Sequence, residues 1–391
     1  MNFVRILMIG GLAAAVPAWA VYAPIPEQDQ GKEWTVTVRA DVSHDSNIFG
    51  AQTGAISSMV YEVAPKIAFN ASLTDQTFAS ASYELTNDYF ENRPGSKNLD
   101  SHDLAARLAH AFSTETTLDL SDEYSITRNP QSLLSGVTIN TDQSYNSNEF
   151  NGRFTTSLAP QTGVTVKFRS MNYSYDNAVL GASIDRTENL YGLAGNYDLV
   201  PEMKLSAEYR HEDVLYRVSG GNKDKHSDFL LGGFDYSVAK KVTATVRVGA
   251  EWRQRDDQQN VTAPYAEMSL KYDYAQGSFI SAGYVHTLEE TSNVVLYTDT
   301  KVNRFFVNVQ HALSALFVAS GSIDFEPSQL QGVIGSPDRN ETTTRLGVAL
   351  SYIPTKNWTV TAHFDYDHVD SDDPSRGQNR DRVGLGASYA F

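Results

Sequence analysis

Cysteine is absent from this chain of 391 residues. Its absence excludes disulfide bonds, thiolate chemistry, cysteine-based zinc sites and lipid anchoring through a processed N-terminal cysteine. Basic residues are scarce relative to acidic ones, with 31 Lys and Arg against 47 Asp and Glu and a net charge of −16. This acidic balance disfavours nucleic acid as a partner, because binding to phosphates needs an excess of Lys and Arg.

Long apolar runs are missing after the N-terminus, and the one near it is short. Arg5 precedes an apolar stretch from Ile6 to Val16, and Ala18-Trp19-Ala20 has the small-x-small pattern of a signal peptidase site. We expect residues 1–20 to be a cleaved secretory signal, since the stretch is too short to cross a bilayer as a helix. Residues 21–32 are then a short periplasmic segment, which leaves no room for a plug domain.

The chain also lacks linkers: no Pro/Ser-rich hinge, low-complexity stretch or composition shift interrupts residues 33–391. What is present instead is an alternation with a period of two that returns about every twenty residues. In the first run Val36, Val38 and Ala40 alternate with Thr37 and Arg39. Successive strand residues point to opposite faces, so each run has one apolar face and one polar, charged face.

Long and short connections alternate between these runs, as in outer-membrane barrels with long external loops and short periplasmic turns. The expected fold is all-β: a single transmembrane antiparallel up-and-down β-barrel of about eighteen strands, with sixteen as the alternative if 147–159 and 163–175 are misread. The expected strands are 33–43, 58–71, 77–87, 100–112, 116–127, 147–159, 163–175, 186–199, 203–212, 227–238, 242–254, 263–274, 278–287, 302–313, 316–326, 341–353, 358–368 and 381–391.

Two runs depart from the pattern. Within 163–175 the apolar phase shifts, because Val166 and Phe168 are followed by Tyr173 and Tyr175 on the opposite phase. We expect a β-bulge there, since one extra residue in a strand reverses its facing. In 227–238, Asp228 occupies the otherwise apolar phase.

The two ends of the barrel segment resemble known sequences. The last nine residues, Val383 to Phe391, resemble the C-terminal sorting signal of bacterial outer-membrane proteins. The resemblance implies recognition by the barrel-assembly machinery through Val383, Leu385, Tyr389 and Phe391. The segment from Arg39 to Phe49 is similar to the first-strand motif of the putative beta-barrel porins type 2, whose relatives accompany exopolysaccharide export systems. We therefore expect the outer membrane of a Gram-negative bacterium, with its lipid and lipopolysaccharide as surroundings.

The polar phase supplies the expected pore lining, in which both signs of charge are spread around the wall. Small residues on the same phase leave room for water, and a barrel of this size is wide enough for an aqueous channel. The expected pore-lining residues are Arg39, Glu62, Lys66, Glu84, Arg107, Glu123, Arg153, Lys167, Arg169, Glu208, Arg210, Arg247, Glu251, Glu267, Lys271, Arg304, Arg345, Asp365 and Arg382.

No catalytic group, cofactor site or metal site is predicted. His363, Asp365 and Asp367 share the polar face of one run, a spacing that also suits a metal ion or an acid/base pair. A polar pore wall explains the trio more simply. Asp45-Ser46-Asn47 does not have the spacing of a calcium loop. We therefore do not expect an enzyme.

Three functions remain open. The first is passive diffusion of small hydrophilic solutes through a porin-like channel with a polar lumen of mixed charge. The second is an exit component for exopolysaccharide, which a row of inward aromatics would favour; Tyr265, Phe279 and Phe306 are scattered candidates. The third is an occluded barrel with a structural, adhesive or enzymatic role. The oligomeric state is left open.

Overall fold

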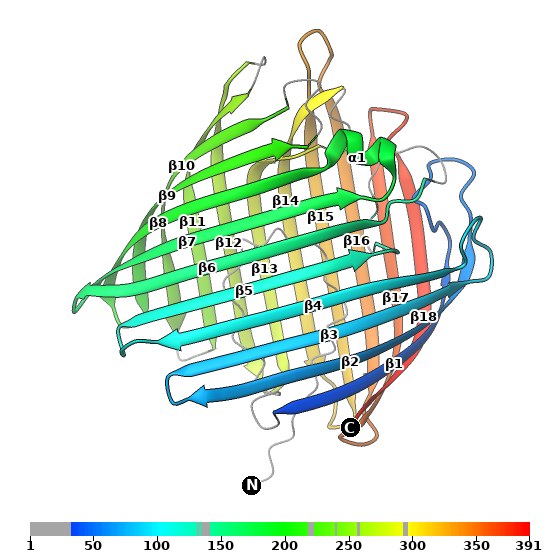
Figure 1. Cartoon of the computed structure of the whole chain (residues 1–391), viewed down its shortest axis with the longest axis horizontal. Coiled ribbons are helices and arrows are strands. Elements are labelled where there is room, and N and C mark those ends of the chain that lie inside the picture. The colour runs from blue at the N-terminus through cyan, green and yellow to red at the C-terminus, as the bar shows by residue number, and fades with distance from the viewer. Residues whose placement is uncertain are drawn as a thin grey trace.

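The computed structural model describes residues 33–130, 133, 141–217, 223–238, 241–255, 259–291 and 296–391. The expected signal at 1–20 and the segment 21–32 lie outside the described residues. The described part forms one sheet of eighteen antiparallel strands that closes on itself, because β18 pairs with β1 (Figure 1). The prediction of a closed barrel of about eighteen strands is confirmed, and the alternative of sixteen is not needed.

The strands run through the chain in order, with one short helix between β7 and β8. Their bounds are β1 Trp34–Asp45, β2 Ser58–Thr74, β3 Thr77–Phe90, β4 Asn98–Ala111, β5 Thr116–Thr127, β6 Tyr145–Ala159, β7 Thr162–Tyr175, α1 Ala178–Ile184, β8 Arg186–Val200, β9 Met203–Tyr216, β10 Lys225–Val238, β11 Val242–Arg255, β12 Val261–Ala275, β13 Ser278–Glu289, β14 Tyr297–Ala312, β15 Phe317–Gly332, β16 Arg339–Tyr352, β17 Trp358–Ser371 and β18 Gln378–Ala390.

Closure joins the first and last strands along most of their length. The β1–β18 ladder runs from Thr37 opposite Ala390 to Asp45 opposite Arg382. Without this ladder, both strands would present unpaired N–H and C=O groups to the bilayer, where each costs several kcal/mol. The barrel therefore has no free edge among its strands.

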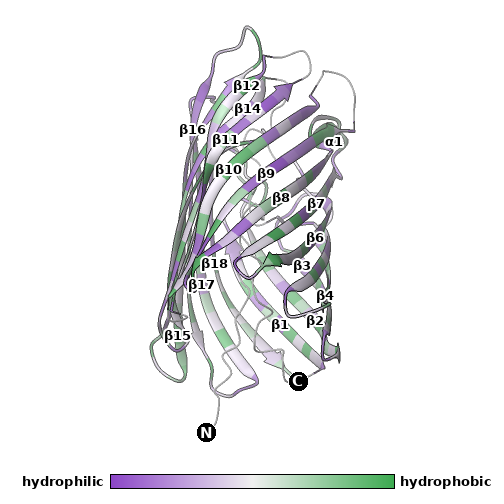
Figure 2. Ribbon diagram, turned by 90° about the vertical axis from the view of Figure 1, so that its left-hand side faces the viewer, coloured by the Kyte–Doolittle hydropathy of each residue, from purple (hydrophilic) through white to green (hydrophobic). Residues whose placement is uncertain are grey.

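The outer face carries the apolar phase of the alternation. Figure 2 shows hydrophobic and hydrophilic residues alternating along the strands. Large apolar side chains are exposed on this wall from many strands, among them Val36, Leu108, Leu193, Leu270, Val348 and Leu385. Exposed aromatics include Trp34 and Trp358 near the short turns, and Tyr209 and Trp252 toward the long loops. An apolar band between aromatic girdles is the surface that lipid selects. No helix among the described residues is long and apolar enough to cross a membrane.

Several strands extend beyond their predicted ends, mainly on the long-loop side. β14 begins at Tyr297 rather than at residue 302, and β15 continues to Gly332 rather than ending at 326. Beyond the lipid, toward the long loops, both faces of a strand meet water or other polar groups. Outward residues there need not be apolar, so the alternation ends although the hydrogen-bonded ladder continues.

The β-bulge expected within 163–175 is absent. β7 keeps one register with β6 from Gly163 to Tyr175 and one register with β8 from Thr162 to Tyr173. Tyr173 and Tyr175 consequently lie on the same face as Lys167 and point into the barrel. The shift in the apolar phase reflects a local partner inside the barrel: Tyr175 packs against a cluster that includes two residues of α1.

We expect Leu108→Arg to destabilise the barrel and Ala105→Arg to be tolerated. Leu108 is exposed on the outer face of β4, where an added charge near the bilayer midplane costs about 2–4 kcal/mol. Ala105 lies on the inner face of the same strand, directly opposite Glu123 of β5. Urea unfolding in lipid vesicles, followed by the heat-modifiable gel band, compares the two. Equal stability of both variants would contradict the assignment of the faces.

Candidate functional site: the barrel interior

The structure places all the expected pore-lining residues on one continuous face. Cross-strand partners in a ladder share a face, and the pairings Asp41–Glu62, Arg345–Asp367 and Asp45–Arg382 connect this face around the ring. The face comprises Arg39, Glu62, Lys66, Glu84, Arg107, Glu123, Arg153, Lys167, Arg169, Glu208, Arg210, Arg247, Glu251, Glu267, Lys271, Arg304, Arg345, Asp365 and Arg382.

Contacts that skip strands identify this face as the concave interior. The Arg39 guanidinium of β1 donates to Glu84 of β3 at 3.4 Å. Arg210 of β9 donates to the Tyr265 hydroxyl of β12 at 3.3 Å. Side chains converge on the inside of a curved sheet and diverge on the outside, so such contacts form only in the interior.

On three strands the burial of the inward charges increases toward the long-loop end. On β1 the exposed fraction of the side chain falls from 39% at Arg39 to 2% at Asp45. On β2 and β11 the same trend leads from 46% at Lys66 to 18% at Glu62, and from 12% at Arg247 to 2% at Arg253. Along these three strands the interior is open to water near the short turns and filled near the long loops. Elsewhere the burial differs, since Glu208 is 1% exposed in the short-turn half of β9 and Glu123 of β5 stays exposed toward the long loops.

One buried ion network fills the interior around β10–β14. Arg253 contacts Glu251 at 2.8 Å and Asp299 at 2.6 Å. Lys225 contacts the same Asp299 at 3.0 Å and Glu290 at 2.6 Å. Asp299 is fully buried, and buried charges persist in proteins only when they are paired and hydrogen-bonded. Because Glu290 belongs to the β13–β14 connection, that connection folds inward at its start.

A second network joins two other connections to the wall around β18 and β1. Arg380 of β18 holds the Asp45 carboxylate through both Nε and Nη2, the latter at 2.5 Å. Its Nη1 donates to the main-chain oxygen of Pro130, which follows β5, at 3.1 Å. The β5–β6 connection therefore crosses the inside of the wall to β18, past β1 to β4.

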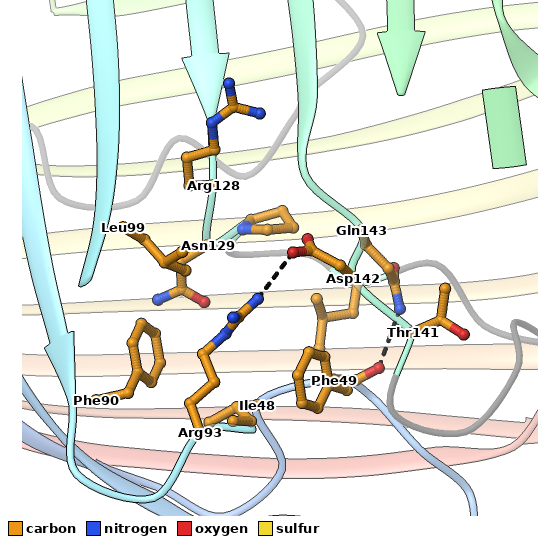
Figure 3. A pocket seen from close by; sticks show the side chains of 12 residues that line it. Ile48, Phe49, Phe90, Arg93, Leu99, Arg128, Asn129, Thr141, Asp142 and Gln143 are labelled. Carbon is orange, nitrogen blue, oxygen red and sulfur yellow. Dashed lines mark hydrogen bonds and ion pairs between the residues drawn. The ribbon is translucent and has the colours of Figure 1, made fainter. Parts of the chain in front are cut away.

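The same connection packs against the β3–β4 connection through Arg93 and against the β1–β2 connection through Phe49 (Figure 3). Arg93 points at Asp142, with 2.8 Å between Nη2 and Oδ2, and Gln143 donates to the main-chain oxygen of Phe49 at 3.0 Å. Phe49 also packs with the inward Phe90. Only about 10 Å³ of cavity remains among these side chains, the space of about one water molecule.

The Asp142 carboxylate is charged at neutral pH. Burial raises the pKa of Asp142, but hydrogen bonds from Ser144 and the Arg93 guanidinium outweigh burial and hold this pKa below its ordinary value. Because the pKa is lowered, the ion pair between Asp142 and Arg93 stays intact at every pH above the ordinary pKa of an aspartate. It is lost only as the pH falls through the lowered pKa.

A third inward element is the helix α1, which lies in the connection 176–185 that was expected to be a plain loop. The Asn177 side chain accepts from the main-chain N–H groups of Val179 and Leu180 and so caps the helix. Leu180 and Ile184 pack on the inward Val214 and Tyr216 of β9. The helix thereby covers part of the inner wall at the long-loop end.

The residues that the sequence offered for a metal site, an acid/base pair or a sugar track do not come together in the structure. His363 lies between Asp41 at 3.1 Å and Asp365 at 3.3 Å, whereas Asp367 contacts Arg382 at 3.3 Å, so the expected trio is not one site. Tyr265 is buried against Phe229, and Phe306 covers Gly283. These aromatics do not form the row of open platforms that a sugar track requires.

Sequence analysis missed three of the most deeply buried charges, although it identified Glu208 and Glu251. Asp45, Asp299 and Arg380 all fell outside the predicted strands. Asp45 continues the phase of Arg39 and Asp41, so extending the period-two pattern by a few residues at the long-loop ends identifies it as inward.

Comparisons with known proteins give one family match and several similar solved structures. A family model described as Putative beta-barrel porin 2 matches residues 34–391. No curated protein matches the sequence. Solved structures that resemble the barrel include the outer membrane protein OpdK from Pseudomonas aeruginosa, with 9% identity, a TM-score of 0.49 and coverage of 92% of this chain and 98% of that one.

Two further similar structures come from other bacteria. OccAB3 from Acinetobacter baumannii is 12% identical, with a TM-score of 0.45 and coverage of 92% of this chain and 99% of that one. The FrpB iron transporter from Neisseria meningitidis is 8% identical, with a TM-score of 0.44 and coverage of 93% and 83%. Sequence identities of 8–12% and TM-scores below 0.5 say nothing about function. The family match is therefore the informative comparison.

We expect Arg380→Met to lower the free energy of unfolding by about 3–5 kcal/mol, because it leaves the buried Asp45 charge without its ion-pair partner. Adding Asp45→Asn to this variant removes the stranded charge and should restore most of the lost stability. Urea titration of the refolded barrel in lipid vesicles measures both. A double variant no more stable than the single one would show that the pair is not the cause.

Proposed function

The chain belongs to the Putative beta-barrel porin 2 family, and we propose that its barrel is a passive channel for small hydrophilic solutes. It is a β-barrel of the outer membrane of a Gram-negative bacterium. One observation supports the proposal most directly. Inward charged side chains near the short turns are 39% exposed at Arg39 and 46% exposed at Lys66 and Lys271, although a closed wall surrounds them. Water must therefore reach that part of the interior.

The proposed route is narrowest at the long-loop end. Three inward segments meet the wall there: the start of the β5–β6 connection, the start of the β13–β14 connection and α1. Both signs of charge line the route, and most are neutralised by neighbours at 2.5–3.6 Å. Such a lining favours small hydrated solutes and gives weak selection by charge.

The pore-lining assignment is part of this proposal. Arg39, Lys66 and Glu84 form a connected group on the water-exposed side, with Glu84 between the two basic groups at 3.4 and 3.5 Å. In the wall formed by β7 and β9, Glu208 is buried and accepts from Lys167 and Arg210. The first group is placed to meet solute, and the second holds the wall in shape.

We propose a non-catalytic role. The residue best suited to proton transfer in the interior, His363, has both ring nitrogens engaged by Asp41 and Asp365. A general base needs a free nitrogen directed at its substrate, and His363 does not offer one.

Assembly is proposed to depend on the terminal strand. Val383, Leu385 and Phe391 are exposed on the outer face, and Tyr389 packs against Trp358 with 5.0 Å between ring centroids. A terminal strand with these apolar and aromatic side chains suits recognition by the barrel-assembly machinery before β18 pairs with β1. In the mature state the same residues meet lipid, and the lipopolysaccharide of the outer leaflet surrounds the long-loop end of the barrel.

Single-channel recording of the refolded protein in planar bilayers tests the proposal. We expect stable open steps and, in vesicles, uptake of small sugars but not of large oligosaccharides. A folded, heat-modifiable protein that neither conducts nor admits sugars would be an occluded barrel, and the proposal would fail.

The constriction predicts a second result. Asp142→Asn removes the charge that holds Arg93, which weakens the anchoring of the β5–β6 connection by about 1–3 kcal/mol. We expect larger or noisier conductance steps than in the natural chain. Asp100→Asn is the matched control, since it removes the same charge from an exposed hydrogen bond with Asn87 on the outer face. Unchanged conductance in Asp142→Asn would place the constriction elsewhere.

A further inference from the structure

The outer face of β9 and β10 carries a polar cluster that the channel does not use. The structure brings together His211, Asp213, His226 and Asp228, and Asp228 is the residue that breaks the apolar phase of its strand. In the ladder, Asp228 is opposite His211 and His226 is opposite Asp213. Because Glu208, Arg210 and Glu212 point inward, these four side chains point outward.

Two histidine nitrogens converge on one carboxylate oxygen in this cluster. Oδ1 of Asp213 lies 3.2 Å from Nε2 of His211 and 2.6 Å from Nδ1 of His226. The three atoms lie within 4.8 Å of one another, and the two rings are parallel to within 9°. Bonds of about 2.0–2.2 Å in a tetrahedral zinc site separate neighbouring ligand atoms by about 3.4 Å. Small side-chain rotations therefore suffice to seat one ion.

The other nitrogen of His211 has the partner that metal-binding histidines usually have. Oδ1 of Asp228 lies 2.9 Å from Nδ1 of His211, and the Tyr209 hydroxyl donates to the same oxygen at 2.6 Å. A carboxylate on the far nitrogen fixes the orientation and tautomer of a ligating imidazole and increases its basicity. Asp228 thus acts as a positioning residue that keeps Nε2 of His211 directed at Asp213.

The position on the wall suits an ion. Beside the cluster in the neighbouring strands are Tyr191 and Trp252, and farther toward the long loops are Asn189 and Gln254. The cluster therefore lies where the aromatic girdle gives way to polar groups. The side chains are partly exposed, at 37% for His211, 25% for Asp213 and 45% for His226. An ion reaches them from water without crossing the barrel.

We propose that His211, Asp213 and His226 form a binding site for a divalent transition metal ion of the zinc class on the outer rim of the barrel. Imidazole and carboxylate together suit Zn²⁺ and its neighbours better than Ca²⁺ or Mg²⁺, which prefer oxygen ligands alone. The ion takes the place of the protons between Asp213 and the two rings, and a water completes the coordination. Its ligands come from two strands, so it links β9 to β10.

Metal titration of the refolded full barrel in detergent, stripped with a chelator and free of any affinity tag, tests the site. Zn²⁺ is followed by calorimetry and Co²⁺ by its visible absorption. We expect one equivalent of either ion, with the absorption of a four-coordinate site. His226→Ala and Asp213→Asn should weaken binding about tenfold or more, and His102→Ala, on the outer face of β4, should leave it unchanged.

Asp228→Asn separates positioning from ligation. We expect about 10–100-fold weaker binding with the same absorption spectrum, since the ligand atoms are kept. Zinc should also raise the temperature of the heat-modifiable transition in the natural chain but not in His226→Ala, because only a cross-strand ligand set stabilises the folded barrel.

The proposal is overturned if the natural chain binds no more tightly than Asp213→Asn, or if His102→Ala weakens binding as much as His226→Ala. All variants are first checked for the heat-modifiable band of a folded barrel. Asp213→Asn keeps the size of the side chain, so it provides a folded comparison even if a histidine variant fails to assemble.

Discussion

A main-chain N–H or C=O group without a partner in hydrocarbon costs several kcal/mol, and the whole architecture depends on avoiding that cost. The β1–β18 ladder completes the ring, so that neither Trp34–Asp45 nor Gln378–Ala390 is left with a free edge. Once the ring is closed, each strand has one face in lipid and one face inside. The period of two then separates apolar from charged residues, and the charges gather in the interior.

Pairing of those interior charges shapes the space that remains. Asp299 receives Arg253 and Lys225, and Asp45 receives Arg380, all deeply buried at the long-loop end. A buried charge without a partner is costly, so these groups constrain both the wall and the connections that approach it. Near the short turns Arg39 and Lys66 stay in contact with water. The interior is consequently uneven: it is hydrated beside Arg39 and Lys66 and narrow where the inward connections and α1 meet the wall.

Much of the fold could be predicted from sequence because alternation is a local property. All eighteen strands were predicted, and the facing agrees in all of them except the second half of β7; for β5 the bounds Thr116–Thr127 agree at both ends. The errors arose where tertiary partners override the pattern. A β-bulge was expected to turn Tyr173 and Tyr175 toward the lipid. Both residues instead face inward in an unbroken register, and Tyr175 packs with α1. The helix itself covers only Ala178–Ile184, too few residues for a clear helical period.

The sequence by itself determined that the chain is a barrel, which face of most strands points inward and where the apolar belt lies, because the period of two acts between neighbouring residues. Only the tertiary structure decided which charges meet. Arg380 reaches Asp45 across the closing seam, and Arg253 reaches Asp299 across β12 and β13. His211 and His226 share Asp213 through the β9–β10 register. Such contacts depend on closure, register and curvature, which join residues far apart in the chain and leave no local pattern in it.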